Sequence, residues 1–442
     1  MKIDVGKVID EAKLNSFHIT LAILGFLFTI VEGFEMICLG MITTEIAKDW
    51  GISPQDLTLA HTAVLVGILT GSFAAGMLTD KIGRRKSLLL MFTLAAAGMG
   101  VSYFITNMTQ LVSLRFITGF GAGGALPIAV ALVSEYVPLK YRNMLVIFAY
   151  SGAPFASWVG GYLGNYFIAN YGWHGMFLLG FILALPILIW MFLWVPESVK
   201  YLVVKNENLD TAKSLMRKVN PAVSISDSDE LFINEPPQTQ SSLASLFSSE
   251  MVATTLLLWL AFIGGQVVVY LMSIWLPTFL QNAGWDADLS RKAVGHYYLG
   301  AFFGGILLGY LADRFGAAKV IIATFPIAAV LYFILGQLVD DVNTWWLVAP
   351  IAGAFAVGGI MALAPFAAEL YPTSIRGTGV GAALGVGRIG SIITPTIGTM
   401  LLGAGIGAVG FYRVAMIAPI VASLSIFLLV FFKNRNNKSM KM

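Results

Sequence analysis

The chain of 442 residues is 57% hydrophobic and only 12% charged, whereas roughly a quarter of a soluble domain is charged. This composition predicts an all-α membrane protein embedded in a lipid bilayer. The sequence gives no support for an enzyme, because it shows neither a nucleophile paired with a general base nor a cluster of metal ligands. The single Cys38 excludes an internal disulfide, and no zinc-ligand spacing occurs. We therefore expect no metal, no cofactor and no nucleic-acid partner.

Twelve apolar runs each approach the roughly 20 residues that cross a bilayer as a helix. Six precede and six follow a more polar central segment, which predicts an N-terminal six-helix bundle over 1–195, a cytoplasmic linker over 196–250 and a C-terminal six-helix bundle over 251–442. Within the linker, 196–219 has the pattern of an amphipathic helix and 220–245 is polar. The expected spans are 17–41, 58–79, 87–106, 109–133, 144–168, 175–195, 251–281, 293–312, 318–338, 345–368, 377–402 and 411–432.

The cations are distributed unevenly between the two ends of these runs. Of the 27 lysines and arginines, 21 lie in the termini and in the loops after every second run. Because cytoplasmic loops carry an excess of cations, we expect a multi-pass protein of the inner (plasma) membrane with both termini in the cytoplasm. We also expect a monomer. The opposite side holds only Lys48, Arg291, Lys292 and Arg413.

The first span contains two acids in the sequence Glu32-Gly33-Phe34-Glu35. An ionisable group at mid-membrane depth costs about 2.5 to 3.5 kcal/mol, so it requires a partner, an aqueous cavity or a function. Three residues turn a helix by roughly 300°, which places both carboxylates on one broad face. Gly33 allows another backbone to approach. We predict that the acids carry protons or orient a substrate; a structural ion pair with a neighbouring helix is the alternative.

Two charged segments occur twice in the chain. Residues 76–86 return at 309–319, 233 positions later, and the Glu, Pro and Arg of 135–142 return in 369–376. Such an internal repeat is typical of transporters built from two homologous halves. The repeated charges predict latches that hold the cytoplasmic side closed, and positive-inside anchoring is the alternative. The predicted latch residues are Gly76, Asp80, Gly83, Arg84, Arg85, Glu135, Arg142, Asp313, Glu369 and Arg376.

Arg115 begins the fourth span and is followed by a glycine-rich stretch that ends at Gly124. It lies about 9 Å from the periplasmic end, close to the depth of Glu32 and Glu35. We therefore expect it to pair with one of them, either as part of proton coupling or as a static ion pair. The glycines follow no strand, so they predict close helix packing and not a nucleotide-binding loop.

Arg388 lies roughly 18 Å into the eleventh span, near the centre of the bilayer. The C-terminal half has no acid at a comparable depth. A planar guanidinium can bind a carboxylate with two hydrogen bonds, so this arginine suits an incoming organic anion; pairing with backbone carbonyls is the alternative. The other candidate substrate contacts are Phe34, Gln266, Tyr270 and Tyr298.

These motifs resemble those of a known family. The segment 76–86 resembles the signature loop of the major facilitator superfamily, and 115–124 is similar to its helix 4 motif. Glu32-Gly33-Phe34-Glu35 lies where the aromatic acid:proton symporter family has Asp-Gly-x-Asp. Members of that family also have such residues at the positions of Arg115, Glu135, Arg376 and Arg388.

The resemblance covers nearly the whole chain and implies two pseudo-symmetric six-helix bundles that work by alternating access. It implies proton-coupled uptake of a small organic anion, namely an aromatic carboxylate such as a benzoate derivative. Glu32 and Glu35 would then carry protons, Arg388 would hold the carboxylate and Arg115 would stabilise the deprotonated state. Two departures stand out: both acids are Glu where the family has Asp, and Ala317-Ala318 replace the cations of the first loop, which predicts a weaker C-terminal latch.

Two other functions fit the same scaffold. A proton-driven exporter of drugs or metabolites typically has Gly-Pro-x-x-Gly-Gly in its fifth helix, whereas this chain has Ala153-Pro154 with Gly160-Gly161 displaced. A membrane sensor would bind a ligand without transporting it. The buried acids and Arg388 favour transport over sensing.

Overall fold

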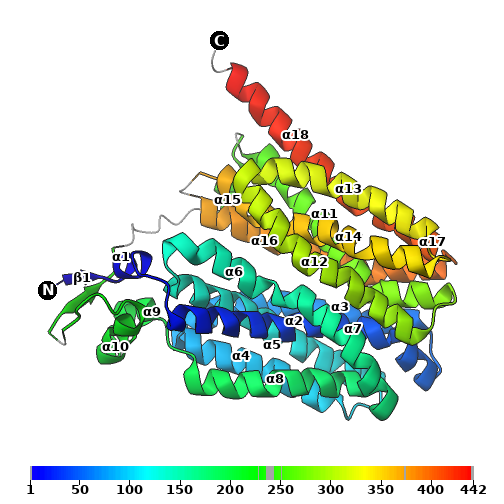
Figure 1. Cartoon of the computed structure of the whole chain (residues 1–442), viewed down its shortest axis with the longest axis horizontal. Coiled ribbons are helices and arrows are strands. Elements are labelled where there is room, and N and C mark those ends of the chain that lie inside the picture. Colours follow the sequence, from blue (N-terminus) through cyan, green and yellow to red (C-terminus); the bar gives the residue numbers. More distant parts are fainter. Residues whose placement is uncertain (1, 227, 235–242, 250, 373–374, 440–442) are drawn as a thin grey trace. The chain divides into compact units, whose positions relative to one another are not determined.

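The computed structural model describes residues 2–226, 228–234, 243–249, 251–372 and 375–439, and helices dominate them (Figure 1). The twelve predicted spans are confirmed as helices, three of them interrupted near one end. They are α2 (Ser16–Trp50), α3 (Thr58–Ile82), α4 (Arg84–Ser102), α5 (Met108–Tyr136), α6 with α7 (Arg142–Tyr150 and Gly152–Tyr171), α8 (Gly175–Trp194), α11 (Val252–Asn282), α12 (Ala287–Phe315), α13 (Ala317–Gln337), α14 with α15 (Val342–Met361 and Leu363–Leu370), α16 (Arg376–Gly403) and α17 with α18 (Ala408–Ala415 and Ile417–Ser439).

Several helices are longer than the apolar runs that predicted them. Helix α2 continues nine residues past the expected end, and α12 begins six residues before its expected start. Of the twelve, only α4 is not long and apolar enough by itself to qualify as a membrane span within the described residues. It has 19 residues and begins with Arg84, Arg85 and Lys86, which lower its mean hydropathy.

The linker is more structured than its composition predicts. In place of one amphipathic helix over 196–219, the chain forms α9 (Val199–Lys205) and α10 (Leu209–Val219). The break follows from Asn206 and Asn208, whose φ angles of 55° and 45° lie in the left-handed region, which asparagine tolerates better than most residues. Residues 227, 235–242 and 250 of the predicted linker lie outside the described part of the chain.

The N-terminus packs against the linker. Strand β1 (Lys2–Asp4) pairs in parallel with β2 (Glu230–Phe232), with Ile3 opposite Leu231. The short α1 (Val5–Asp10) follows, and the Asn220 side chain donates to the Val8 carbonyl at 3.0 Å. Figure 1 shows β1, α1, α9 and α10 together at one end of the N-terminal helices.

The chain divides into two compact units, whose limits cross several helices. Unit 1 comprises Met1–Met36, Ala63–Ala156 and His174–Gln238; unit 2 comprises Ile37–Thr62, Ser157–Trp173 and Thr239–Met442. These limits describe units of close contact, and the six-helix bundles over 1–195 and 251–442 stay a prediction. Residues 37–50 of α2, 58–62 of α3 and 157–171 of α7 belong to the same compact unit as the C-terminal helices.

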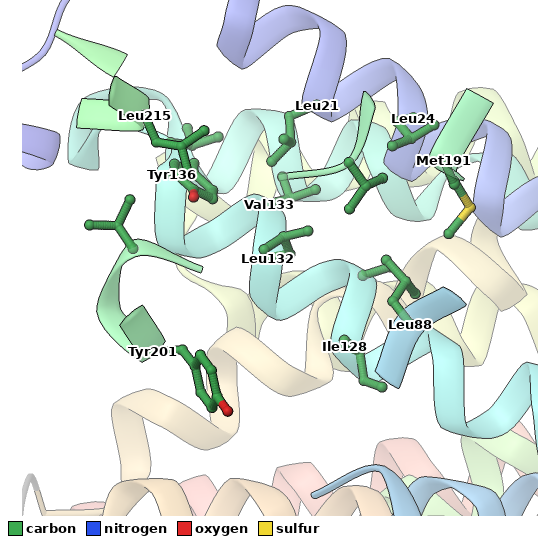
Figure 2. Close-up of a cluster of buried hydrophobic side chains, with 14 of the residues drawn as sticks. Leu21, Leu24, Leu88, Ile128, Leu132, Val133, Tyr136, Met191, Tyr201 and Leu215 are labelled. Atoms are coloured by element: carbon green, nitrogen blue, oxygen red, sulfur yellow. The ribbon is translucent and has the colours of Figure 1, made fainter. Parts of the chain in front are cut away.

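Apolar packing extends from the membrane helices of unit 1 into the linker. Leucines of α2, α4 and α5 and Met191 of α8 form one buried cluster, which also includes Tyr201 of α9 and Leu215 of α10 (Figure 2). The far end of the linker is attached to unit 2 instead, because Leu246 is fully buried there and its carbonyl accepts a hydrogen bond from Thr255 at 3.0 Å. Each end of the linker is thus anchored in its own unit.

Glycines bring pairs of helices into backbone contact. In unit 1, a methyl group at Gly71 of α3 would collide with the carbonyl oxygen of Phe120, and one at Gly123 of α5 would collide with the carbonyl of Ile68. The glycines after Arg115 therefore pack α5 against α3, as predicted. In unit 2, methyl groups at Gly304 of α12 and Gly353 of α14 would collide with Ala354 and Tyr297. Close packing of small residues is a general way to join membrane helices.

This packing predicts the effect of one methyl group. We expect Gly71→Ala to lower the stability of the protein by about 1 to 3 kcal/mol, because the new Cβ has no room beside the α5 backbone. The measurement is the melting temperature in detergent. Gly385→Ala in α16 is the matched control, since a Cβ there would meet nothing within 4 Å and alanine favours a helix. Equal melting temperatures for both variants would contradict the proposed packing.

Candidate functional site

The two acids of α2 line one small cavity in unit 1. Its volume is about 10 Å³, close to the minimum that holds one water molecule. Glu32 and Glu35 are buried, with exposed fractions of 8% and 3%, and they share the cavity with Phe28, Val31, Phe92, Ala95, Met99 and Ala122. The prediction that both carboxylates lie on one face of the helix is confirmed. A Cβ at Gly33 would lie 2.5 Å from the Ala153 Cα, so this glycine does allow α7 to approach.

Arg115 of α5 forms the ion pair that its depth predicted. Its Nη1 lies 2.8 Å from Oε1 of Glu35, and the two side chains are 0% and 2% exposed. The guanidinium is held on its other sides as well: Nη2 donates to Ser102 Oγ at 2.8 Å, and the group lies 4.6 Å from the centre of the Phe177 ring. A buried charge requires this kind of compensation, since neither water nor lipid replaces it at low cost.

The pair uses only part of its bonding capacity. Within the described part of the chain, Oε2 of Glu35 and Nε of Arg115 are buried and form no hydrogen bond. Oε1 of Glu35 accepts from Arg115, while the cavity that the same carboxylate lines has room for about one water molecule. The arrangement can therefore hold a charged carboxylate and still accept a proton or a water at the second oxygen.

Arg388 lies in unit 2, on the α16 face that packs against α11. It is half-buried, and its Nη1 donates to the Tyr270 hydroxyl at 3.0 Å. The helices approach closely here because a methyl group at Gly390 would collide with the Ile263 carbonyl. Gln266, one turn before Tyr270, is half-buried and lies beside Gly390. The arginine, the phenol and the amide therefore come from two helices whose spacing is set by glycine.

Two of the predicted substrate contacts have a packing environment instead. Phe34 is fully buried in unit 1, with its ring against Gly180 of α8. Tyr298 is 1% exposed, and its hydroxyl bonds to the Val269 carbonyl at 2.8 Å and to Ser273 Oγ. Neither side chain is presented to a ligand in this conformation, so their contact with a substrate stays a prediction.

The first predicted latch contains an ion pair and a helix cap. Nε and Nη2 of Arg84 both lie 3.2 Å from Oε1 of Glu135, which joins the start of α4 to the end of α5. Gly83 precedes α4 with a φ of 87°, a left-handed conformation that glycine favours. Arg85 donates to the Phe192 carbonyl at 2.9 Å.

Glu197 is a member of this cluster that the sequence did not predict as a site residue. Its Oε1 accepts from the backbone amides of Arg84 and Arg85 at 2.7 and 3.1 Å. A carboxylate at a helix N-terminus satisfies unpaired N–H groups and is favoured by the helix dipole. Ser198 completes the arrangement by bonding Glu135. The linker thus participates in the cluster, a role that the sequence 196–198 did not indicate.

Other latch residues lie apart from this cluster. Arg142 pairs with Asp10 of α1 at 2.6 Å, a partner that was not predicted. Gly76 is exposed, and a Cβ there would meet nothing within 4 Å, so it lies at no close helix contact. Among the described residues, Asp80 and Glu369 are exposed and form no ion pair. Arg376 is the first residue of α16, and the side chain of Asp313 lies outside the described part.

Comparison with known proteins identifies the family. The sequence model of the Major Facilitator Superfamily matches residues 21–295 and 293–441. The chain belongs to the major facilitator superfamily. Like other members it is a transporter and not an enzyme, and its fold is the twelve-helix bundle of that superfamily. Among the residues described, no group of three or more His, Cys, Asp or Glu could hold a metal ion.

Two relatives in this superfamily are named as transporters of aromatic acids. The chain is 34% identical to the 4-hydroxybenzoate transporter PcaK of Pseudomonas aeruginosa over 91% of this chain and 90% of that protein. It is 29% identical to the gallate transporter of Pseudomonas putida, over 96% and 94% of the two chains. Among solved structures, the partially occluded, inward-open xylose transporter XylE from E. coli has a TM-score of 0.71 at 18% identity over 93% and 97% of the chains. That likeness concerns the fold alone.

The buried ion pair predicts an asymmetry between single and double variants. We expect Arg115→Leu to destabilise the protein by roughly 3 to 5 kcal/mol, because it leaves the Glu35 charge buried without its cation. Adding Glu35→Gln removes that charge and should recover part of the lost stability. Thermal unfolding in detergent measures both. A double variant no more stable than Arg115→Leu would show that the two side chains do not stabilise each other.

Proposed function

We propose that this transporter takes up an aromatic carboxylic acid of the benzoate or hydroxybenzoate type together with protons. The observation that carries the proposal is the half-buried Arg388, whose guanidinium bonds the Tyr270 hydroxyl between α11 and α16. A guanidinium recognises a carboxylate with two hydrogen bonds, and a neighbouring phenol can bond or stack with an aromatic guest. The names of the relatives, which transport 4-hydroxybenzoate, gallate and benzoate, support the same cargo class.

Proton coupling is assigned to the acids of α2. A monoanion that enters a negative-inside cell works against about 2.3 kcal/mol per 100 mV, so one accompanying proton makes transport electrically neutral and a second makes it driven by voltage. Glu32 and Glu35 are carboxylates buried beside one cavity, which supports a proton-carrying role. In this mechanism Arg115 stabilises the deprotonated state of Glu35 through the 2.8 Å contact.

The remaining assignments follow from charge distribution and from the cluster around Glu135. We propose that the protein lies in the inner membrane, with both termini and the cation-rich ends of the helices in the cytoplasm. A monomer is part of the same proposal. The ion pair of Arg84 with Glu135 and the cap by Glu197 are then cytoplasmic. We assign them the role of a latch that stabilises one state of an alternating-access cycle.

The function is tested by uptake into proteoliposomes. We expect an imposed gradient, acidic outside, to drive accumulation of benzoate or 4-hydroxybenzoate, because the proton that enters with the anion supplies the driving force. An aliphatic acid and a cationic drug are compared under the same gradient. Radiolabelled uptake with and without a protonophore is the measurement.

Each alternative gives a different result in this assay. Accumulation of the cationic drug alone under the reversed gradient, acidic inside, would favour the exporter, because antiport moves the drug against the proton. Binding of benzoate without flux would favour a sensor. The Glu32→Gln and Glu35→Gln variants test the coupling: if both still take up protons with the substrate, the acids are not the proton carriers.

The role of Arg388 is tested by a substitution that keeps its charge. We expect Arg388→Lys to raise the KM for the aromatic acid roughly tenfold or more, because an ammonium group loses one of the two charge-assisted bonds to the carboxylate. Initial rates of uptake at varied substrate concentration give the value. Arg413→Lys, at an exposed position of α17, is the control. An unchanged KM in Arg388→Lys would remove this residue from the substrate site.

A further inference from the structure

A second buried arginine lies in unit 2, away from the groups discussed so far. Arg291 is in the second turn of α12 and is 5% exposed. Its Nη1 forms an ion pair with Glu45 of α2, and its Nε donates to Oδ1 of Asn165 in α7. The cluster therefore joins two helices of the N-terminal half to one of the C-terminal half. All three residues belong to unit 2.

The cluster is closed by further bonds and by backbone packing. The Asn165 side-chain amide donates to the Gly161 carbonyl at 3.1 Å and to the Asp288 carbonyl at 3.2 Å, so it fixes α7 against the first turn of α12. A Cβ at Gly161 would lie 2.6 Å from the Arg291 carbonyl oxygen. The charges thus sit where α7 and α12 touch, and a buried arginine in such a place is stable only while its partners stay.

Two further contacts within unit 2 join α2 and α3 to other helices. A Cβ at Gly40 of α2 would lie 2.5 Å from the Ser273 carbonyl of α11, and Thr58, which begins α3, bonds Thr399 of α16. Neither contact involves a charged group: the first is close backbone packing and the second is a hydrogen bond between two hydroxyls. The Arg291 cluster supplies a buried ion pair in this region. Lys292 and Asp288, on the same helix as Arg291, form a second pair at 2.6 Å that is more exposed.

We propose that the cluster of Arg291, Glu45 and Asn165 is the lock of the outer gate, on the side opposite the cation-rich ends of the helices. This inference rests on the proposed transport function, because a carrier must open that side once in each cycle. Opening separates α2 and α7 from α12, so the ion pair exchanges its partner for water each time. A charge-assisted contact suits this purpose because water can replace it, whereas a wholly apolar seal gains nothing from hydration.

Helix α2 connects this lock to the proposed proton site. Glu35 and Glu45 are ten residues apart on one helix, a separation of roughly 15 Å along its axis. Helix α2 contains no proline. The limit between the two units falls between Met36 and Ile37, one residue beyond Glu35. Glu35 of the buried ion pair and Glu45 of the lock therefore lie on one continuous helix.

The lock is tested by the accessibility of a cysteine beneath it. Ser157 of α7 is fully buried and its hydroxyl has no hydrogen-bond partner within the described residues, so Ser157→Cys is a conservative reporter; Cys38→Ser removes the native thiol. Intact cells are treated with a membrane-impermeant maleimide without added substrate. We expect Arg291→Gln or Glu45→Gln to label roughly tenfold faster than the parent, the change that a lost hydrogen bond to a charged group produces. Lys292→Gln should label at the parental rate.

The outcomes separate this inference from the proposed function. Parental labelling rates in Arg291→Gln, Glu45→Gln and the double variant would overturn the lock, and so would equally fast labelling in Lys292→Gln. Because labelling requires no substrate, a failure of benzoate uptake would reject the cargo and leave this result standing. Melting temperatures within a few degrees of the parent verify folding, and Asn165→Ala, which keeps both charges, provides a milder variant with an expected intermediate rate.

Discussion

The structure depends on one constraint: a charge that lies among apolar helices must be compensated where it lies. Arg115 meets this constraint with Glu35, with the Ser102 hydroxyl and with the face of Phe177. Either charge buried without its partner would strongly destabilise the protein. The contacts of the pair therefore hold α2, α4, α5 and α8 relative to one another. A site held this firmly can be altered by a proton, because protonation of the carboxylate removes the attraction while the other contacts of the arginine remain.

The scaffold around the charges is repeated, but the charges are not. Gly71 and Gly304 are separated by the 233 positions that relate the two signature loops, and each brings its helix into backbone contact with the next but one. Gly119 and Gly353 follow at 234, the offset that relates Glu135 to Glu369. The same offset takes Arg115 to Ala349. Duplication therefore preserved the helix packing of both halves, while the buried arginine of this position exists only in the first half. In the proposed mechanism, this divergence gives the two units different roles, with Glu32, Glu35 and Arg115 in unit 1 and Arg388 in unit 2.

Much of this arrangement could be predicted from the sequence, because the cost of buried charge and the length of a span are local properties. The twelve spans, the shared face of Glu32 and Glu35 and the pairing of Arg115 all followed from counting residues along helices. The ends of the helices did not follow from such counting. Arg291 precedes the apolar run and therefore resembled a loop cation. In the structure α12 already begins at Ala287, and Arg291 is buried. Glu197 and the pairing of β1 with β2 were missed for another reason, since their partners are over a hundred residues away and no local pattern encodes such contacts.

The length of α2 gives these observations a mechanical meaning. A span needs roughly 20 residues, yet α2 has 35, so it extends well beyond the apolar run that defines it. Its glycines at 25, 33 and 40 each contact another helix, in α6, α7 and α11, and its acids at 32, 35 and 45 face a cavity, an arginine of unit 1 and an arginine of unit 2. One helix thus contacts both compact units through glycine and through charge. Helix α2 contains no proline, which is one of the usual causes of a sharp kink. In the proposed mechanism, neutralising Glu35 and releasing Glu45 act on one continuous helix, which is the simplest physical basis for coupling a proton to a gate.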